Sequence, residues 1–427
     1  MGLWSKKWLV LWSLWAARLL PQPTLVIQVS NGPMRGTISP DGSHAQYSGI
    51  PYATITQRFQ SPGPEPVWEY VFNAIDEHAR CSQSLQDIFM MGTEQCLVLN
   101  IYNPLNITPN SKLPVMVFIH GGAYYKGSGA SLLAKVMSFE SEDPYDLYKF
   151  FMTKTDDELI LTRVPRIAGT VITSEILYTP CAEKVIEGEE AFLTESPFDI
   201  LTRGDYNKVP VILGANDEEG LLLFFLDKAD MKGNIKLEKS LPKNLEFSSE
   251  IDRLEVVQKL LRLYIEEDIS VNTIVNITRW IGEVGLIYPM LEETELQLKT
   301  NENPIYNYMF QYSGNRNIPK MLMPSSLRSV KGATHADEIF YIFSQNIIPT
   351  TIFENSIIES MTTMWTNFAK YGDPTPDFTN PPIKWYRTNS TSLTALVIDS
   401  EFSTAPLWYN ERVKYLREVY SKFRRKG

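Results

Sequence analysis

The chain has 427 residues, of which 44% are hydrophobic and 12% aromatic, and its formal net charge at pH 7 is −10. This composition can supply a large packed core and argues against an intrinsically disordered chain. The acidic balance offers no basic stripe to displace phosphate counterions, which argues against nucleic acid as a partner.

Residues 1–23 are expected to be a signal peptide. Lys6 and Lys7 precede the apolar run "WLVLWSLWAA", which ends at Arg18. This run is too short to cross a bilayer and has about the length of a signal-peptide core. Because no other stretch reaches that length, we expect no stable membrane span and a secreted mature chain, residues 24–427.

Short strands and a possible disulfide are predicted for the first part of the mature chain. Residues 24–60 alternate short apolar runs with turn residues, as a β-hairpin does. Cys81 and Cys96 are close enough in sequence to close a loop by a disulfide, a bond common in secreted proteins. Cys181 is left over and is expected to be a small buried hydrophobe.

Three acceptor sequons for N-linked glycans agree with a secretory route. They begin at Asn106 ("NIT"), Asn276 ("NIT") and Asn389 ("NST"). Such short motifs also occur by chance, so they support the signal peptide without establishing it.

Buried strands and amphipathic helices predict one α/β domain. The runs "LVLNIYNP", "LPVMVFIHGG", "VPVILGAN" and "PIYNYMFQYSG" lack polar alternation, which is typical of parallel strands covered on both faces. Helical patterns begin at Ser131. Two apolar helix faces follow, one of Leu254, Val257, Leu260, Leu261 and Tyr264, and one of Ile357, Met361, Met364, Trp365 and Phe368, stopped by "YGDP".

The loop "HGGAYYKG" is the first of three stretches that could carry chemistry. Its glycines would let backbone N–H groups approach an oxyanion, although an ordinary strand-to-turn connection looks the same. In "NDEEG", Asp217, Glu218 and Glu219 follow a predicted strand, where ligand sites of α/β proteins form, or they cap the next helix. His335, in "GATHADE", could be a general base oriented by a carboxylate, or an ordinary surface residue.

Taken together, in the order loop, acid, histidine, these stretches resemble the type-B carboxylesterases, which include cholinesterases and insect juvenile-hormone esterases. Matching stretches such as "YSGIPYA", "TEQCLVLNIYNP", "EEAFLTESPFDIL" and "MWTNFAKYGDPTP" cover nearly the whole mature chain in family order. The resemblance implies an α/β-hydrolase fold with a mostly parallel central sheet. It also implies hydrolysis of small-molecule carboxylic esters without a cofactor or a metal.

The resemblance assigns roles to individual residues. Gly122 and Ala123 would donate N–H groups to the oxyanion, His335 would be the general base, and Glu219 would orient its ring. Cys81 and Cys96 would correspond to the family's first disulfide.

The chain departs from the family at the nucleophile, because it contains no G-x-S-x-G elbow. Instead "YYKGSG" runs directly into "ASLLAKVMSFESEDPYDLYKFF", which resembles a helical region beyond the elbow. The domain, residues 24–427, thus carries an internal deletion near residues 129–131 that would remove the serine and central strands. Unless "VMVFI" pairs directly with "VPVILG", it would be left with open edges.

Three functions remain open. The favoured one is a family member that is inactive as it stands, because Ser128 and Ser131 have no strained turn to present an oxygen to His335. A second is a secreted ester hydrolase that is active in a fuller isoform. A third is a non-catalytic relative that uses Tyr124 and Tyr125 to bind apolar esters, or that acts in adhesion.

Overall fold

A computed structural model describes residues 22–85, 89–105, 107–108, 111–122, 130–141, 143–162, 170, 182–188, 191–226, 236, 239–264, 271–343, 350–407 and 410–425. The chain forms two compact units, one of Met1–Lys112 with Gly127–Val164 and one of Leu113–Lys126 with Pro165–Gly427. Nearly all of the predicted signal peptide lies outside the described residues. In the described part, no helix combines the length and the hydropathy needed to span a membrane.

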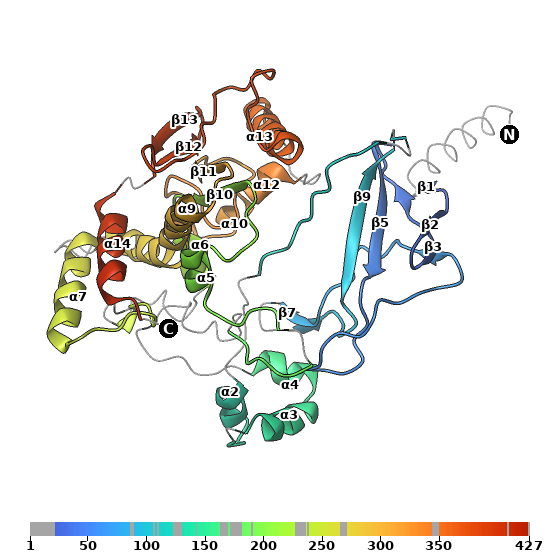
Figure 1. Ribbon diagram of the computed structural model, residues 1–427, viewed down its shortest axis with the longest axis horizontal. Coiled ribbons are helices and arrows are strands. Elements are labelled where there is room, and N and C mark those ends of the chain that lie inside the picture. The colour runs from blue at the N-terminus through green and yellow to red at the C-terminus, as the bar shows by residue number, and fades with distance from the viewer. Residues whose placement is uncertain are drawn as a thin grey trace, which may run out of the picture. The chain divides into compact units, whose positions relative to one another are not determined.

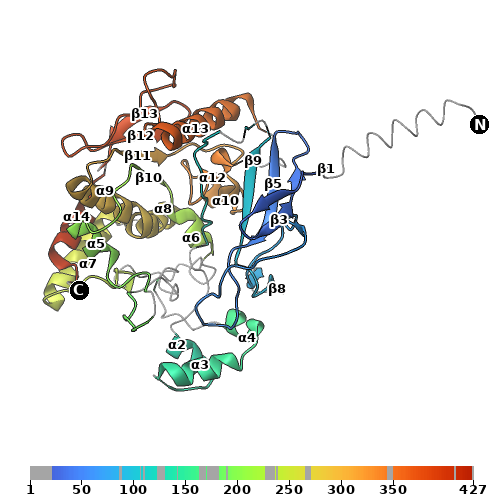
Figure 2. The same cartoon turned by 45° about the vertical axis from the view of Figure 1, so that its right-hand side comes forward.

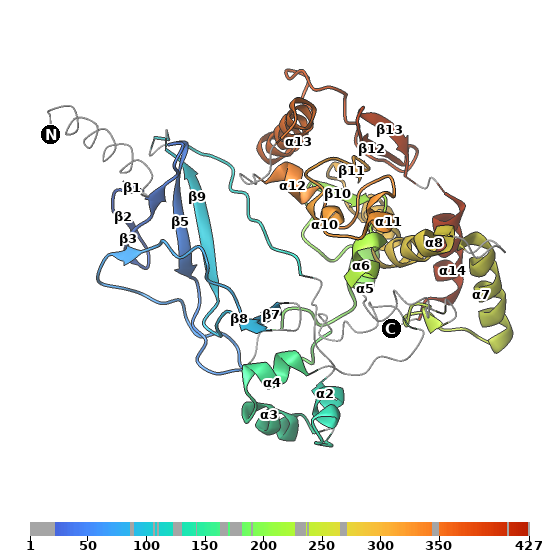
Figure 3. The same ribbon diagram turned by 180° about the vertical axis from the view of Figure 1, so that it is seen from behind.

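Mostly antiparallel strands and short helices make up the described part of the first unit; the exception is the parallel pair of β3 and β6. Its elements are β1 (Gln22–Pro23), β2 (Ile27–Val29), β3 (Gly32–Arg35), β4 (Thr37–Ile38), β5 (His44–Pro51), β6 (Phe72–Asn73), β7 (Gln83–Leu85), β8 (Phe89–Met91), β9 (Val98–Pro104), α2 (Ala130–Val136), α3 (Pro144–Met152) and α4 (Asp156–Leu161). β5 and β9 lie side by side as the longest ribbon of this unit (Figure 3). The predicted hairpin is present as β2 and β3, which are antiparallel and pair Val29 with Gly32.

The run "LVLNIYNP" forms β9, but the prediction that it is buried in a parallel sheet is wrong. β9 pairs antiparallel with β5, and the side chains of Leu99 and Ile101 are exposed. An apolar run without alternation indicates a strand, and it does not specify whether the tertiary structure covers both faces.

The disulfide between Cys81 and Cys96 is present. The loop that it closes is tied to the start of α4, because the Ser82 hydroxyl donates to Asp156 Oδ2 at 2.6 Å. Arg58 forms ion pairs with both Asp156 and Glu94, which connects α4 to the loop a second time. A disulfide and polar contacts therefore hold this loop and the start of α4 together.

The second unit holds the larger sheet and most of the helices. Its elements are α5 (Pro197–Arg203), β10 (Val211–Asn216), α6 (Gly220–Leu226), α7 (Glu250–Tyr264), α8 (Val271–Gly282), the π-helix η3 (Glu283–Ile287), α9 (Tyr288–Thr300), β11 (Ile305–Phe310), α10 (Ile318–Met321), α11 (Ser325–Arg328), α12 (Ile339–Ile342), α13 (Ile352–Tyr371), β12 (Thr394–Ile398), β13 (Ser403–Pro406) and α14 (Glu411–Phe423).

The sheet of the second unit has the strand order β10-β11-β12-β13 (Figure 2). β10, β11 and β12 are parallel, and β13 is antiparallel to β12. On one face Phe310 packs in a cluster with Met361 of α13. On the other face Met309 packs in a cluster with Leu291 of α9 and Val413 of α14. Helices therefore cover both faces of parallel strands, as expected for the α/β part of the chain.

The predicted apolar face is confirmed for α13 and is partly wrong for α7. In α13, Ile357, Met361 and Met364 are buried, and Trp365 and Phe368 pack against their cluster as predicted. In α7, Leu254 is exposed and Val256 is buried instead. α13 begins with a capping box between Thr351 and Glu354 and ends at Gly372, whose φ of +69° suits glycine.

The prediction that "LPVMVFIHGG" is a buried strand is wrong. Residues 111–122 belong to no strand, and Val115, Val117 and Ile119 are 86%, 82% and 86% exposed. The direct pairing of "VMVFI" with "VPVILG", which would have closed the open edges, is not made either, because β10 pairs only with β11 among the described strands. A β-branched run is buried in a sheet only where another part of the chain supplies its neighbours.

Candidate active site

The acids Asp217, Glu218 and Glu219 lie in a sharp turn between β10 and α6. Gly220 follows them, and a Cβ there would lie 1.8 Å from the carbonyl oxygen of Thr278 in α8. Only glycine permits this close approach of backbone to backbone. The turn therefore starts at the carboxyl end of a parallel strand and is pressed against a neighbouring helix.

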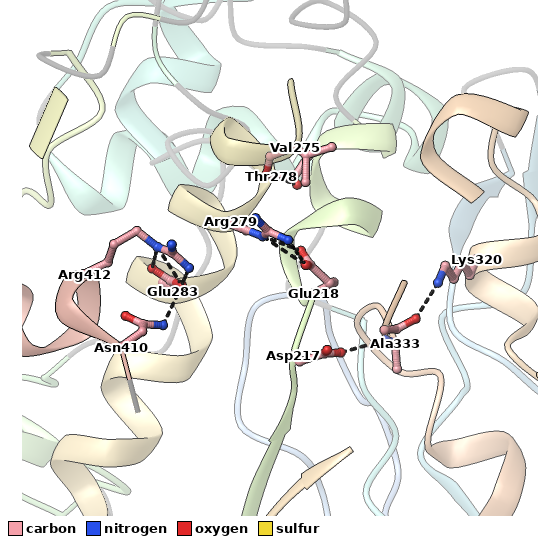
Figure 4. A network of polar contacts seen from close by, with 11 residues as sticks. Asp217, Glu218, Val275, Thr278, Arg279, Glu283, Lys320, Ala333, Asn410 and Arg412 are labelled. Carbon is pink, nitrogen blue, oxygen red and sulfur yellow. Dashed lines mark hydrogen bonds and ion pairs between the residues drawn. The ribbon is translucent and has the colours of Figure 1, made fainter. Parts of the chain in front are cut away.

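The three acids point in three different directions. Asp217 Oδ1 accepts from the Ala333 N–H at 2.8 Å, and Glu218 pairs with Arg279 at 2.7 Å (Figure 4). Glu219 Oε1 accepts from the Asn216 N–H at 2.7 Å. None of the three lies in the first turn of α6, so the interpretation that they only cap this helix is wrong.

His335 lies 2.8 Å from Glu219, measured from ring Nδ1 to carboxylate Oε2. A carboxylate can only accept, so Nδ1–H is the donor and the neutral ring keeps a free lone pair on Nε2. The side chain of Glu219 is 7% exposed and that of His335 is 38% exposed. The arrangement is a buried carboxylate that orients an imidazole whose Nε2 has no hydrogen bond to any residue that the structure describes.

The loop that carries His335 is held on both sides. The Thr334 N–H donates to Asp337 Oδ2 at 2.8 Å, and the Thr334 hydroxyl accepts from the Leu222 N–H at 2.8 Å. Ala336 has a φ of +69°, which is unfavourable for a residue with a side chain and persists only where surrounding contacts impose it. The position of His335 is therefore set by buried hydrogen bonds of its neighbours.

The hydrogen bond to Glu219 raises the pKa of His335 above its ordinary value, against the opposing effect of burial. The charge of Glu219 acts in the same direction because it favours the imidazolium. The ring is thereby a stronger base than a free histidine.

Glu338, three residues after His335, is a further carboxyl that the sequence analysis missed. It accepts from the Asn216 amide at 2.5 Å. Burial raises the pKa of Glu338 to about 7, and the charge of Glu219 adds to this effect. The motif "HADE" contains this residue, but nothing in its polar pattern indicates that the side chain is buried.

Of the expected oxyanion loop, the structure describes only residues 120–122. Gly122 lies in the exposed 111–122 stretch, and no hydrogen bond within the described residues links it to Glu219 or His335. Ala123 lies outside the described residues, as do Ser128, Tyr124 and Tyr125.

A nucleophile for His335 is not found in the described part of the chain, where Glu219 is the one hydrogen-bond partner of the ring. Ser131 is in α2 of the first unit, and its side chain lies outside the described residues. The described residues also hold no cluster of His, Cys, Asp and Glu that could bind a metal ion.

Comparisons with known proteins agree on one family. The sequence profile of the carboxylesterase family matches residues 23–138 and 129–416. A carboxylic ester hydrolase of Bombus ignitus is 23% identical over 452 aligned positions, covering 75% of this chain and 80% of that protein. Juvenile hormone esterase of Tribolium castaneum is 26% identical over 475 positions, covering 78% and 81%. Several other relatives match over only about a quarter of their own length.

A solved structure gives the same picture for the fold. Juvenile hormone esterase from Manduca sexta, with OTFP covalently attached, superposes with a TM-score of 0.73 at 15% identity, covering 93% of this chain and 99% of that one.

Replacing Glu219 by Gln should lower the pKa of His335, because the charged acceptor of its Nδ1–H is lost. NMR titration of the histidine rings checks this, with the His335 signal assigned through His335→Gln. Glu218→Gln is the matched control, since Glu218 faces Arg279 instead of the ring. An unchanged titration of His335 in Glu219→Gln would contradict the assigned pairing.

Glu338→Gln should stabilise the fold above neutral pH. The folded pKa of about 7 lies above the unfolded value, so the stability from this carboxyl is complete below the unfolded pKa and is lost as pH rises through 7. The amide removes this loss and should add about 1–3 kcal/mol to the free energy of unfolding at pH 8 and little at pH 5.

Urea unfolding at both pH values measures the effect of Glu338→Gln. The exposed Glu302→Gln is the control and should show no such pH dependence. Equal effects of Glu338→Gln at the two pH values would contradict a buried, proton-binding carboxyl.

Proposed function

Since the chain belongs to the carboxylesterase family, we propose that it is a secreted serine-esterase relative that keeps the acid and base of ester hydrolysis and lacks the nucleophile. The observation that carries this proposal is the 2.8 Å contact between Glu219 and His335 in a chain without a G-x-S-x-G elbow. On this proposal the chain does not hydrolyse carboxylic esters as it stands.

The chemistry that the pair would serve follows from its geometry. A serine hydroxyl placed at Nε2 of His335 would give its proton to the ring while its oxygen bonds to the ester carbonyl carbon. Glu219 would stabilise the imidazolium, and N–H groups of Gly122 and Ala123 would stabilise the oxyanion. The ring would then pass its proton to the departing alcohol, and water would release the acid by the same steps.

Two further observations support an internal deletion. The two matched parts of the family profile meet at residues 129–138, close to the junction expected from the motifs. The alignment with the Tribolium castaneum esterase is longer than this chain, although only 78% of the chain takes part in it. That relative therefore contains a large number of residues without a counterpart here.

A second candidate function is ester hydrolysis by a fuller isoform that restores the missing segment. The contact between Glu219 and His335 supports it, because the carboxylate already orients the imidazole through Nδ1. The substrates would be small-molecule carboxylic esters, as for the family. The ligand-binding alternative depends on Tyr124 and Tyr125, outside the described residues.

Secretion and glycosylation are part of the proposal. Asn389 lies in a turn in which its Oδ1 accepts from the Thr391 N–H and the Thr391 hydroxyl, at 3.0 and 2.7 Å. Asn276 lies in α8, and its sequon partner Thr278 is fully buried. Asn106 is outside the described residues. The exposed turn at Asn389 is thus the strongest of the three proposed sites.

Without a nucleophile, the purified chain should not be labelled by a fluorophosphonate probe, and its hydrolysis of p-nitrophenyl acetate should stay at the solution background. His335→Ala should leave that rate unchanged. A chain with the intervening segment restored should be labelled on the elbow serine. Labelling of any hydroxyl in the present chain, mapped by mass spectrometry, would overturn the proposal.

Expressed in an animal secretory cell line, the chain should reach the medium and carry glycan at Asn389. Asn389→Gln and Thr391→Ala should each remove the same step in electrophoretic mobility, because both destroy one sequon. Ser390→Ala preserves the sequon and is the control. A chain that stays in the cells, or one insensitive to glycosidase, would contradict this.

A further inference from the structure

Two unpaired β-forming surfaces occur in the second unit. One is the 113–119 segment, "LPVMVFI", which is extended and belongs to no strand (Figure 1). The other is the outer edge of β10, because β10 ends the sheet and pairs with β11 alone in the described part of the chain.

The edge of β10 offers regular hydrogen-bonding groups. The Val211 N–H donates to the Pro304 carbonyl at 3.0 Å, which directs it toward β11. Backbone groups alternate sides along a strand, so the N–H groups of Ile212 and Gly214 point to the open edge. The open edge of β10 ends at Asn216, because the Asn216 N–H already donates to the Glu219 carboxylate. An apolar strand with such an edge is a template for a further strand.

The 113–119 segment has the composition of a central strand and the exposure of a surface loop. It contains no charged residue, and Val115, Val117 and Ile119 are more than four-fifths exposed. Phe118 packs against Phe343, with ring centroids 4.6 Å apart, which holds the segment beside the end of α12. Because the segment is apolar, uncharged and rich in β-branched residues, it can bury its exposed side chains by pairing with a sheet edge.

We propose that two copies of the chain associate by strand exchange, in which the 113–119 segment of each copy pairs with the β10 edge of the other. The association is reciprocal, so each copy contributes one segment and one edge, and the contact closes as a dimer. It is independent of catalysis, because it uses none of the groups around His335.

A second copy fits this surface better than pairing within one chain. The segment and β10 belong to the same unit, yet the segment does not pair with the β10 edge of its own chain. The edge of a second copy can approach the segment from solvent in either direction.

The surface is also large enough for a stable contact. The apolar residues of the segment are largely exposed, and two segments with the two edges that they cover can supply the roughly 1,200–2,000 Å² of a stable interface. The apolar character of both partners supplies the driving force.

Light scattering coupled to gel filtration tests the association on the full mature chain. The wild-type chain should have twice the monomer mass at micromolar concentration, and Val117→Lys should raise the dimer dissociation constant at least tenfold. Ile352→Lys, at an equally exposed apolar residue of α13, is the matched control and should remain a dimer. A monomeric wild-type chain, open-ended oligomers, or equal effects of the two variants would overturn the proposal.

Cross-linking tests which surfaces meet, independently of the folding of any charged variant. Copies with Val117→Cys and one tag are mixed with copies with Val209→Cys and another tag, both carrying Cys181→Ser. Val209 is exposed and directly precedes Pro210 at the start of β10. A short bismaleimide should join the two tags. Links between two Val117→Cys copies only, or a link formed only within a chain that carries both cysteines, would overturn the exchange.

Discussion

The hydrogen bond between Glu219 and His335 is the contact on which the functional interpretation of this chain depends. The two residues lie in loops that are more than a hundred residues apart in sequence. One loop follows β10 and the other lies in the connection between β11 and β12, and β10 and β11 are adjacent parallel strands of one unit. Asp217 clamps the second loop through the Ala333 N–H, and Leu222 clamps it through Thr334. Each clamp joins the turn after β10, or helix α6, to the loop around His335. The pair is therefore positioned by the fold of the second unit and does not require a nucleophile to be in place.

The same arrangement concentrates buried carboxyl groups around the histidine. Burial raises the pKa of Asp217 to about 7 and that of Asp337 to about 6, in addition to the similar shift of Glu338. Such groups lower the stability of the folded chain as pH rises through these values. Hydrogen bonds from Ala333, Thr334 and Asn216 offset part of this cost. The surroundings of His335 therefore combine buried carboxyl groups with an energetic cost that these hydrogen bonds only partly offset.

The incomplete sheet is the second constraint on this molecule. β11 and β12 have helices on both faces and a strand on both sides, but β10 has a strand on one side only in the described part. The 113–119 segment, which has the composition of its missing neighbours, stays exposed. On the proposed internal deletion, the absence of the elbow would have two linked consequences: a general base without a nucleophile, and an apolar segment without a sheet. The second consequence exposes the chain to association, because an open edge and an unpaired apolar segment are complementary.

The amino-acid sequence by itself determined the family, the α/β-hydrolase fold, the strands β10 and β11, the apolar face of α13 and the identity of Glu219 and His335 as candidate partners. These follow from local patterns and from motif order, which a single sequence contains. The tertiary structure alone decided that "VMVFI" is not a strand, that β9 is antiparallel and exposed, and that Glu338 is buried beside the pair. Each of these outcomes depends on which distant segment lies alongside, and neither a run of apolar residues nor a single acid in a polar motif carries that information.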